Sequence, residues 1–182
     1  MDFSEAHKCT GPDPVFSPNG RYVATAVDFR LVIRDVESLQ ILQLYSCLDK
    51  VEEVIWSCDS AYLLCGLYKR GIVQVWSVDD HTWTCKIDEG PAGVAHARWA
   101  PSGRRDGFSS VRKPGRPAVE SHPARRHVIT VADFKLRLSV WSLVDRSCVQ
   151  YPSPKVTEAG KGIAFTEDGR FMALAEVRTC GT

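Results

Sequence analysis

The chain has 182 residues, of which 44% are hydrophobic and 25% are charged, and its formal net charge is +1. This balance is typical of a soluble globular protein and argues against a disordered or strongly basic chain. The first residues lack a basic segment followed by an apolar one, and no apolar run approaches about eighteen residues, so we expect neither secretion nor a membrane span.

A short pattern recurs four times along the chain. In each copy an aromatic residue ends an apolar run, a polar turn rich in Pro, Asp, Ser and Gly follows, and a second apolar run begins. The aromatic residues are Phe16, Trp56, Trp99 and Phe165, so successive copies lie 40, 43 and 66 residues apart. A period of about forty residues that contains several short strands is typical of the blades of a β-propeller.

The chain opens with a polar, proline-containing lead-in, residues 1–14, and the first repeat covers residues 15–50. The strands predicted in that repeat are 21–27, 30–34 and 39–45. The first two are joined at Asp28, which lies six residues before Arg34. Because the side chains of turn aspartates bond the backbone of their own turn, we interpret Asp28 as a structural residue and not as a catalytic one.

The second repeat, residues 51–90, shows the pattern most clearly. Its predicted strands are 54–56, 61–67, 72–76 and 83–87, and Lys69-Arg70-Gly71 is a hairpin signal between the middle two. Four short strands in each period are what a propeller blade requires. Strands such as 61–67 are continuously apolar, which suits an inner strand that neighbouring blades cover on both faces.

The third repeat, residues 91–152, contains a stretch that does not fit the pattern. Residues 105–126 hold three prolines, two glycines and six basic residues against two acids. Removing these 22 residues restores a spacing of 43 between Trp76 and Trp141, which end equivalent strands. We interpret the stretch as an insertion into a strand hairpin, with pairing resumed at His127. Because Phe108 is its only aromatic residue, a solvated loop is favoured over a nucleic-acid contact.

Limited proteolysis tests this interpretation of the insertion. A proline-rich protrusion cannot pair along a sheet, since each proline lacks the amide donor. Limited proteolysis is therefore expected to cut first within it, at Arg112, Lys113, Arg116, Arg125 or Arg126. Early cleavage inside the second repeat, with the insertion protected, would contradict the prediction.

The fourth repeat, residues 153–182, contains two predicted strands, 162–165 and 171–175, and then the chain stops. The strands of the first three repeats end in the dipeptides Arg34-Asp35, Trp76-Ser77 and Trp141-Ser142, which resemble the WD dipeptide. The sequence therefore predicts an all-β fold, an incomplete WD-repeat β-propeller of about three and a half blades of four-stranded antiparallel sheet. Its open edges favour self-association.

The side chains that carry chemistry form no recognisable site. Seven cysteines and five histidines are scattered without the close pairs that zinc requires, so we expect no metal, and thiols that act as small hydrophobic groups in a reducing compartment, cytosol or nucleus. No nucleophile motif or phosphate-binding glycine loop is present, so we expect no catalytic residues and no cofactor. The acids weighed for an enzyme, which we interpret as belonging to solvated loops, are Asp49, Glu52, Glu53, Asp79 and Asp80.

Three segments resemble a known family more closely than a generic repeat would. They are 34–45, 68–77 and 85–90, and they resemble the WRAP-type WD-repeat proteins of centrosomes, centriolar satellites and spindle poles. The resemblance extends from the N-terminus to about Glu176, apart from the insertion. Since family members are longer, it implies a short or truncated isoform with an insertion and a divergent tail, Val177 to Thr182.

The resemblance implies a function as well as a fold. Family members are non-enzymatic scaffolds of the cytoplasm and cytoskeleton that anchor microtubule minus ends and support spindle assembly and ciliogenesis. The implied partner is a coiled-coil spindle-pole or centriolar-satellite protein, in fungi together with a minus-end-directed kinesin. The alternatives are a non-functional or regulatory isoform, an enzyme that uses a propeller face, and a nucleic-acid-associated protein that acts through residues 105–126. The residues that contact the partner stay open at this stage.

Overall fold

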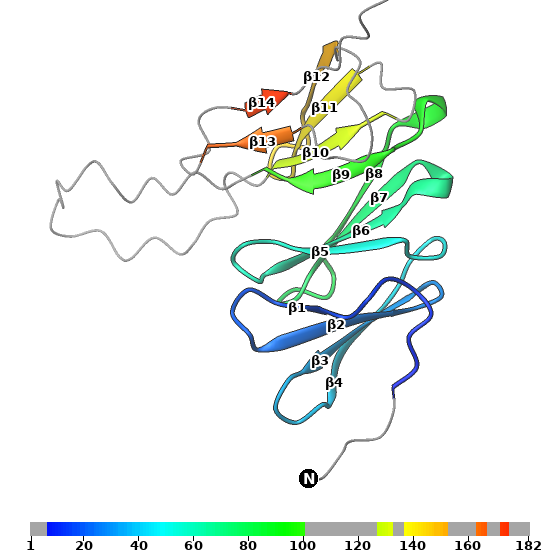
Figure 1. Cartoon of the computed structure of the whole chain (residues 1–182), viewed down its shortest axis with the longest axis vertical. Coiled ribbons are helices and arrows are strands. Elements are labelled where there is room, and N and C mark those ends of the chain that lie inside the picture. Colours follow the sequence, from blue (N-terminus) through cyan, green and yellow to red (C-terminus); the bar gives the residue numbers. More distant parts are fainter. Residues whose placement is uncertain (1–6, 101–126, 133–136, 153–162, 167–171, 175–182) are drawn as a thin grey trace, which may run out of the picture. The chain divides into compact units, whose positions relative to one another are not determined.

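The structure is a computed structural model that describes residues 7–100, 127–132, 137–152, 163–166 and 172–174. The described elements are fourteen short strands and two single-turn 3₁₀ helices, and the chain divides into two compact units, Met1–Val94 and Ala95–Thr182 (Figure 1). The strands of the first unit are β1 (Val15–Phe16), β2 (Tyr22–Val27), β3 (Arg30–Asp35), β4 (Ile41–Ser46), β5 (Glu53–Trp56), β6 (Tyr62–Leu67), β7 (Ile72–Ser77) and β8 (Thr84–Asp88). Those of the second are β9 (His96–Trp99), β10 (His127–Val131), β11 (Arg137–Ser142), β12 (Cys148–Pro152), β13 (Ile163–Phe165) and β14 (Met172–Leu174).

The first blade is the antiparallel sheet β1-β2-β3-β4. Its predicted strands are confirmed, except that β4 begins at Ile41 and not at Leu39. The reason is a turn after β3, in which the carboxylate of Asp35 accepts hydrogen bonds from the amides of Glu37 and Ser38 and Leu39 takes a left-handed conformation, with φ of 57°. These local bonds compete with strand pairing and delay β4 by two residues.

The second blade is the antiparallel sheet β5-β6-β7-β8, and all four of its predicted strands are confirmed. The expected hairpin between β6 and β7 contains a 3₁₀ turn, Tyr68–Arg70, that ends at Gly71 with φ of 66°. Backbone in this region favours glycine, because a Cβ atom would crowd the following carbonyl group. In the sequence Lys69-Arg70-Gly71, the glycine thus occupies the position that has left-handed backbone.

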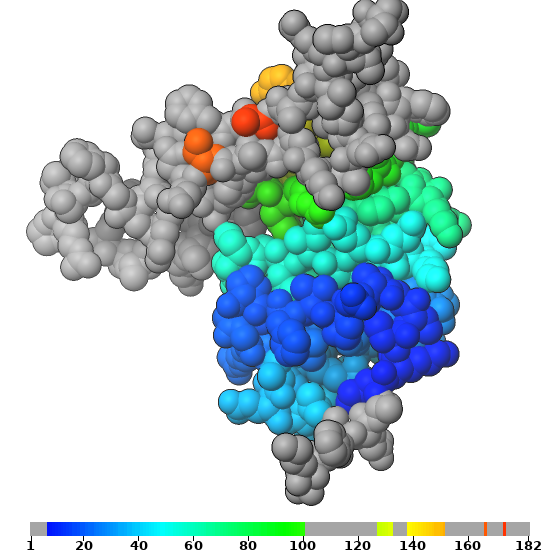
Figure 2. Space-filling view, viewed as in Figure 1, coloured from blue at the N-terminus to red at the C-terminus, as the bar shows by residue number. Residues whose placement is uncertain are grey.

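The two blades of the first unit pack face to face and share one hydrophobic core, in which Leu31, Ile33, Leu63 and Leu67 are completely buried. Figures 1 and 2 show the second sheet lying directly on the first. The residues that each blade contributes follow from the two-residue period of a strand. The first blade contributes Ala24, Ala26, Leu31, Ile33 and Tyr45, and the second contributes Val54, Trp56, Leu63, Cys65, Leu67 and Ile72.

Aromatic side chains tie the blades together at two places. Trp56 is 6% exposed, stacks on Tyr22 with ring centroids 6.1 Å apart, and donates its indole N–H to the carbonyl oxygen of Val15 at 2.9 Å. Tyr45 stacks on Trp76 at 4.9 Å and donates its hydroxyl to the carbonyl oxygen of Ser77 at 2.5 Å. Trp56, the recurring aromatic residue of the second repeat, therefore packs against the first blade.

The aromatic residue of the first repeat has no such role in the described part of the chain. Phe16 pairs with Val23 just as Trp56 pairs with Leu63, so the two occupy equivalent positions. Phe16 is nevertheless 62% exposed. Leu44 and Ile41 are also exposed, and register places them on the same face of the first blade. This face is the equivalent of the one that the second blade buries against the first.

The second unit contains a third four-stranded antiparallel sheet, in the order β9-β10-β11-β12, and a two-stranded sheet, β13-β14. β10 begins at His127 and pairs with β9, with Val128 opposite Trp99, so the predicted resumption of pairing is confirmed. Ile129, Val131 and Leu138 form its buried core. The predicted insertion, residues 105–126, lies outside the described residues, as do the last residues of the fourth repeat.

The strand-ending tryptophans differ in one hydrogen bond. Trp141 donates its indole N–H to the hydroxyl of Thr130 at 2.9 Å. Arg34 occupies the equivalent position in the first blade, and it donates to the hydroxyl of Thr25 at 3.2 Å. In the second blade the position of the threonine is taken by Cys65, and the buried indole nitrogen of Trp76 makes no hydrogen bond of ordinary geometry among the described residues, although its N–H helps to lower the pKa of the Cys47 thiol.

Replacing Cys65 by threonine is therefore expected to stabilise the protein. Cys65→Thr supplies the acceptor that Thr130 gives Trp141, and one buried hydrogen bond contributes about 1 kcal/mol. The reverse change, Thr130→Cys, is expected to cost a similar amount. Urea denaturation followed by tryptophan fluorescence measures both, and a loss of stability in Cys65→Thr would contradict the assigned acceptor position.

Candidate protein-contact surface

Three loops of the first unit come together at one end of its two blades. The β2–β3 turn and the β4–β5 connection run side by side, because the amides of Cys47 and Val51 donate to the carbonyl oxygens of Phe29 and Asp28 at 2.7 and 3.0 Å. The amide of Glu52 donates to the carbonyl oxygen of Gly66, which brings in the β6–β7 hairpin. Exposed residues of these loops include the acid Asp28 and six others, which we call the loop-end surface: Phe29, Arg30, Leu48, Lys50, Lys69 and Arg70.

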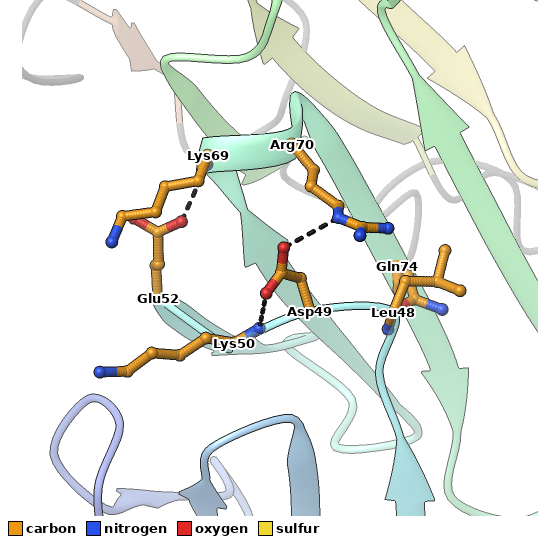
Figure 3. Close-up of polar contacts among 7 residues, drawn as sticks. All are labelled: Leu48, Asp49, Lys50, Glu52, Lys69, Arg70 and Gln74. Carbon is orange, nitrogen blue, oxygen red and sulfur yellow. Dashed lines mark hydrogen bonds and ion pairs between the residues drawn. The ribbon is translucent and has the colours of Figure 1, made fainter.

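Two large apolar side chains of this surface lie open to solvent. Phe29 and Leu48 are each 49% exposed. The backbone of Leu48 is held in place, since its amide donates to the side-chain oxygen of the buried Gln74 at 2.8 Å (Figure 3). Exposed apolar groups on a fixed loop are typical of protein-binding surfaces, because binding them orders little additional chain.

The acids beside them are engaged in local contacts (Figure 3). One oxygen of Asp49 pairs with Nε of Arg70 at 2.8 Å, and the other accepts from the amide of Lys50 at 2.7 Å. These contacts, the Lys50 amide first, hold the pKa of Asp49 below its usual value. Glu52 accepts from the amide of Lys69 at 2.9 Å. Asp49 and Glu52 thus both connect the β4–β5 loop to the β6–β7 hairpin, and Asp49 also stabilises its own loop through the Lys50 amide.

Asp28 is structural, as predicted, but it acts by a different contact. Its carboxylate accepts a hydrogen bond from the hydroxyl of Thr10 at 3.0 Å, and that hydroxyl in turn accepts from the Asp28 amide at 2.6 Å. The amides of Thr10 and Gly11 also donate to the carbonyl oxygen of Ala26. The aspartate therefore fastens the lead-in to the β2–β3 turn, and the expectation that it bonds its own turn was wrong.

The acids weighed for catalysis are not brought to one place. Asp49 and Glu52 lie at the end of the blade where β7 begins, whereas Asp79 and Asp80 follow the other end of β7, where Asp80 accepts from Thr82. Glu53 was predicted in a loop, but it lies in β5 and accepts from the hydroxyl of Tyr68. Among the described residues no group of three or more His, Cys, Asp and Glu side chains could hold a metal ion.

The cysteines divide between the core and the surface. Cys47 and Cys65 are buried in the shared core, whereas Cys9 and Cys58 are exposed. A hydrogen bond between the two buried thiols lowers the pKa of Cys47 and, together with burial, raises that of Cys65. The prediction that cysteines act as small hydrophobic groups is confirmed for this pair.

Tyr45 makes the contact between blades sensitive to alkaline pH. Burial, followed by the negative charges of Asp79 and Asp80, raises the pKa of its phenol to about 12, from 10.0. Below pH 10 the phenol is protonated in both states. Between about pH 10 and 12 the unfolded chain loses the proton first, so the free energy of unfolding falls by up to about 1.4 kcal/mol for each pH unit.

The expected result is a Tyr45→Phe variant whose stability declines less between about pH 9 and about pH 11 than that of the unchanged chain. Urea denaturation at each pH measures the two slopes, and the comparison of slopes removes the constant cost of losing the bond to Ser77. Equal slopes would show that the Tyr45 phenol is not the titrating group.

The arrangement of the sheets defines the class of protein. A search of protein-family models finds no match. The structure resembles the β-propeller domain of Cps50 (Swd1) from Myceliophteria thermophila, with a TM-score of 0.60 and 19% identity, over 90% of this chain and 48% of that one. It also resembles the dihydro-heme d1 dehydrogenase NirN, with a TM-score of 0.57 and 17% identity, over 93% of this chain and 33% of that one. The chain therefore has the fold of an incomplete β-propeller.

The sequence comparison narrows the class. The chain is 44% identical over 180 residues to the mouse WD repeat-containing protein WRAP73, a match that covers 99% of this chain and 34% of that protein. This similarity to a WRAP-type WD-repeat protein confirms the resemblance seen in the sequence. The chain spans about a third of the length of this relative. In the described residues no helix is long and apolar enough to cross a membrane.

Sequence reasoning did not identify Phe29 and Leu48 as surface residues. A signal was present, because each is a large apolar residue next to an aspartate and outside the two-residue alternation of the neighbouring strand. What the sequence lacks is the pairing of the two loops, which brings residues nineteen positions apart to one end of the blade.

Proposed function

We propose that the chain is a non-enzymatic WD-repeat scaffold that binds a protein partner through the loop-end surface. The observation that carries this proposal is the exposure of Phe29 and Leu48, each 49%, on loops whose backbone amides are hydrogen-bonded. Loops on a rigid sheet scaffold are where binding residues concentrate, since the sheets fix the position of the loops at no further entropic cost. The dispersed acids support binding over catalysis.

The cellular role that we propose is based on the similarity to the WRAP-type relative. We propose that the chain acts at the centrosome and spindle pole, where it helps to anchor microtubule minus ends and supports spindle assembly and ciliogenesis, with a coiled-coil spindle-pole or centriolar-satellite protein as partner. The support is the 44% identity to a WRAP-type protein over nearly the whole chain.

The experiment is to express the tagged chain in cultured cells and to measure its enrichment at γ-tubulin-marked spindle poles. The double variant Phe29→Ser with Leu48→Ser should lose this enrichment. Val144→Ser is the matched control, because Val144 is an exposed apolar residue in the turn between β11 and β12. Absence of the unchanged chain from spindle poles would overturn the proposed location, and enrichment of the double variant would overturn the role of the surface.

We further propose that the chain associates with a second copy through the open face of the first blade. The supporting observation is the exposure of Phe16, Ile41 and Leu44 on the face whose equivalent the second blade buries. Sedimentation velocity should show concentration-dependent dimers that the variant Phe16→Ser with Leu44→Ser does not form. A strictly monomeric unchanged chain would contradict this proposal.

A further inference from the structure

The acids beside the loop-end surface accept local hydrogen bonds or ion pairs, whereas the ammonium groups of its lysines do not form ion pairs with described residues. Its neighbouring acids have local partners: Asp28 is bonded to Thr10, Asp49 to Arg70 and Lys50, and Glu52 to the Lys69 amide. The contacts to Lys50 and Lys69 use only backbone amides. Accordingly, neither lysine ammonium group forms an ion pair within the part of the chain that the structure describes.

The position of these ammonium groups is plain in Figure 3. The side chains of Lys50 and Lys69 extend in the same direction, away from the Asp49–Arg70 pair, and both are exposed. A third cation stands beside the apolar part of the surface, because the guanidinium carbon of Arg30 lies 5.6 Å from the ring centroid of Phe29. The surface therefore presents unpaired positive charge on the same loops as its two exposed apolar side chains.

This combination defines the chemistry of a complementary ligand. Carboxylates would pair with the cations, where opposite charges speed and orient docking, and apolar side chains would cover Phe29 and Leu48. A purely apolar segment would leave the lysines without partners, and a basic one would offer them no carboxylate.

Building on the proposed scaffold function, we infer that the loop-end surface is the docking site for an acidic, amphipathic segment of a partner protein. Its carboxylates pair with Arg30, Lys50 and Lys69, and its leucine or phenylalanine side chains pack on Phe29 and Leu48. The segment is recognised by its pattern of charge and apolar groups.

The test uses the full chain and a short fluorescent peptide in which glutamate alternates with leucine and phenylalanine. Fluorescence anisotropy measures binding, and two further peptides carry lysine in place of glutamate or serine in place of the apolar residues. We expect binding of the first peptide only, with affinity that falls as salt rises from about 0.05 M to about 0.5 M, because exposed charges are screened.

Two double variants and two matched controls locate the site. Lys50→Glu with Lys69→Glu, and separately Phe29→Ser with Leu48→Ser, are each expected to weaken binding about tenfold or more. Arg21→Glu reverses an exposed cation on the turn between β1 and β2, and Val144→Ser removes an exposed apolar group in the turn between β11 and β12; neither should change the affinity. Thermal denaturation of every variant confirms that it is folded.

The outcomes separate this inference from the proposed function. Equal binding of the lysine peptide, or equal effects of the site variants and the controls, would overturn the acidic docking site. Enrichment at spindle poles together with failure to bind the acidic peptide leaves the scaffold function in place and rejects the inference. Peptide binding at this site by a chain that is absent from spindle poles supports the inference and rejects the location.

Discussion

Replacement of Trp56 by alanine should lower the free energy of unfolding by about 3–5 kcal/mol, the usual cost of removing a large buried aromatic side chain. Trp56 is 6% exposed in the core shared by the first two blades. The change removes the stacking on Tyr22, leaves a cavity, and deprives the carbonyl oxygen of Val15 of the indole donor at 2.9 Å. Since a typical domain has only about 5–15 kcal/mol of stability, much of it would be lost.

Phe16 is the matched control for this prediction. It occupies the equivalent position in the first repeat, but it is 62% exposed. Phe16→Ala is therefore expected to change the free energy of unfolding by no more than about 0.5 kcal/mol, as surface substitutions usually do. Guanidinium denaturation of both variants, followed by circular dichroism, measures the difference. Equal losses would mean that the first blade buries Phe16 as the second buries Trp56.

Gly71→Ala should destabilise the protein by about 2–4 kcal/mol, through two causes that act at one position. The first is conformational, since Gly71 has φ of 66°, which L-residues with a Cβ atom rarely adopt. The second is steric, because an added Cβ atom would lie 2.9 Å from the Cα atom of Gly93. The obstacle is backbone, so it cannot be relieved by rotation of a side chain.

Gly20→Ala separates the two causes. Gly20 has φ of 72°, but nothing lies within 4 Å of the position of an added Cβ atom. Only the conformational cost applies there, about 1 kcal/mol. Urea denaturation of the two variants gives the steric part as the difference between them. If Gly20→Ala proved as costly as Gly71→Ala, contact with Gly93 would not be the cause.

Most of the blade architecture could be predicted because its determinants are local in the sequence. The four strands of the second repeat alternate with turns that carry their own signals, such as Gly71, and the period of about forty residues then identifies the fold. The start of β4 was missed because the Asp35 carboxylate captures the amides of the following turn. A side-chain bond of this kind competes with strand pairing without altering the hydrophobic pattern.

The candidate surface could not be predicted, since its determinants are contacts between distant residues. Asp28 reads as a turn aspartate, but its partner Thr10 lies eighteen positions earlier in the lead-in. The open lysines are recognisable only once the acids beside them are seen to be engaged elsewhere, as Glu52 is by the Lys69 amide. Such pairings depend on how the loops of two blades meet.

The open face of the first blade has a consequence for how the purified protein behaves over time. Its outermost strand, β4, reads Ile-Leu-Gln-Leu-Tyr-Ser, with neither a charge nor a proline, and its Ile41, Leu42 and Leu44 are exposed. By contrast, the outer strand of the second blade, β8, carries the Lys86–Asp88 ion pair. Segments of six or so uncharged residues with high β-propensity seed cross-β fibrils, and charges oppose that growth. During storage at high concentration, fibril formation is therefore expected to begin at β4, and a lysine placed at Leu42 would delay it.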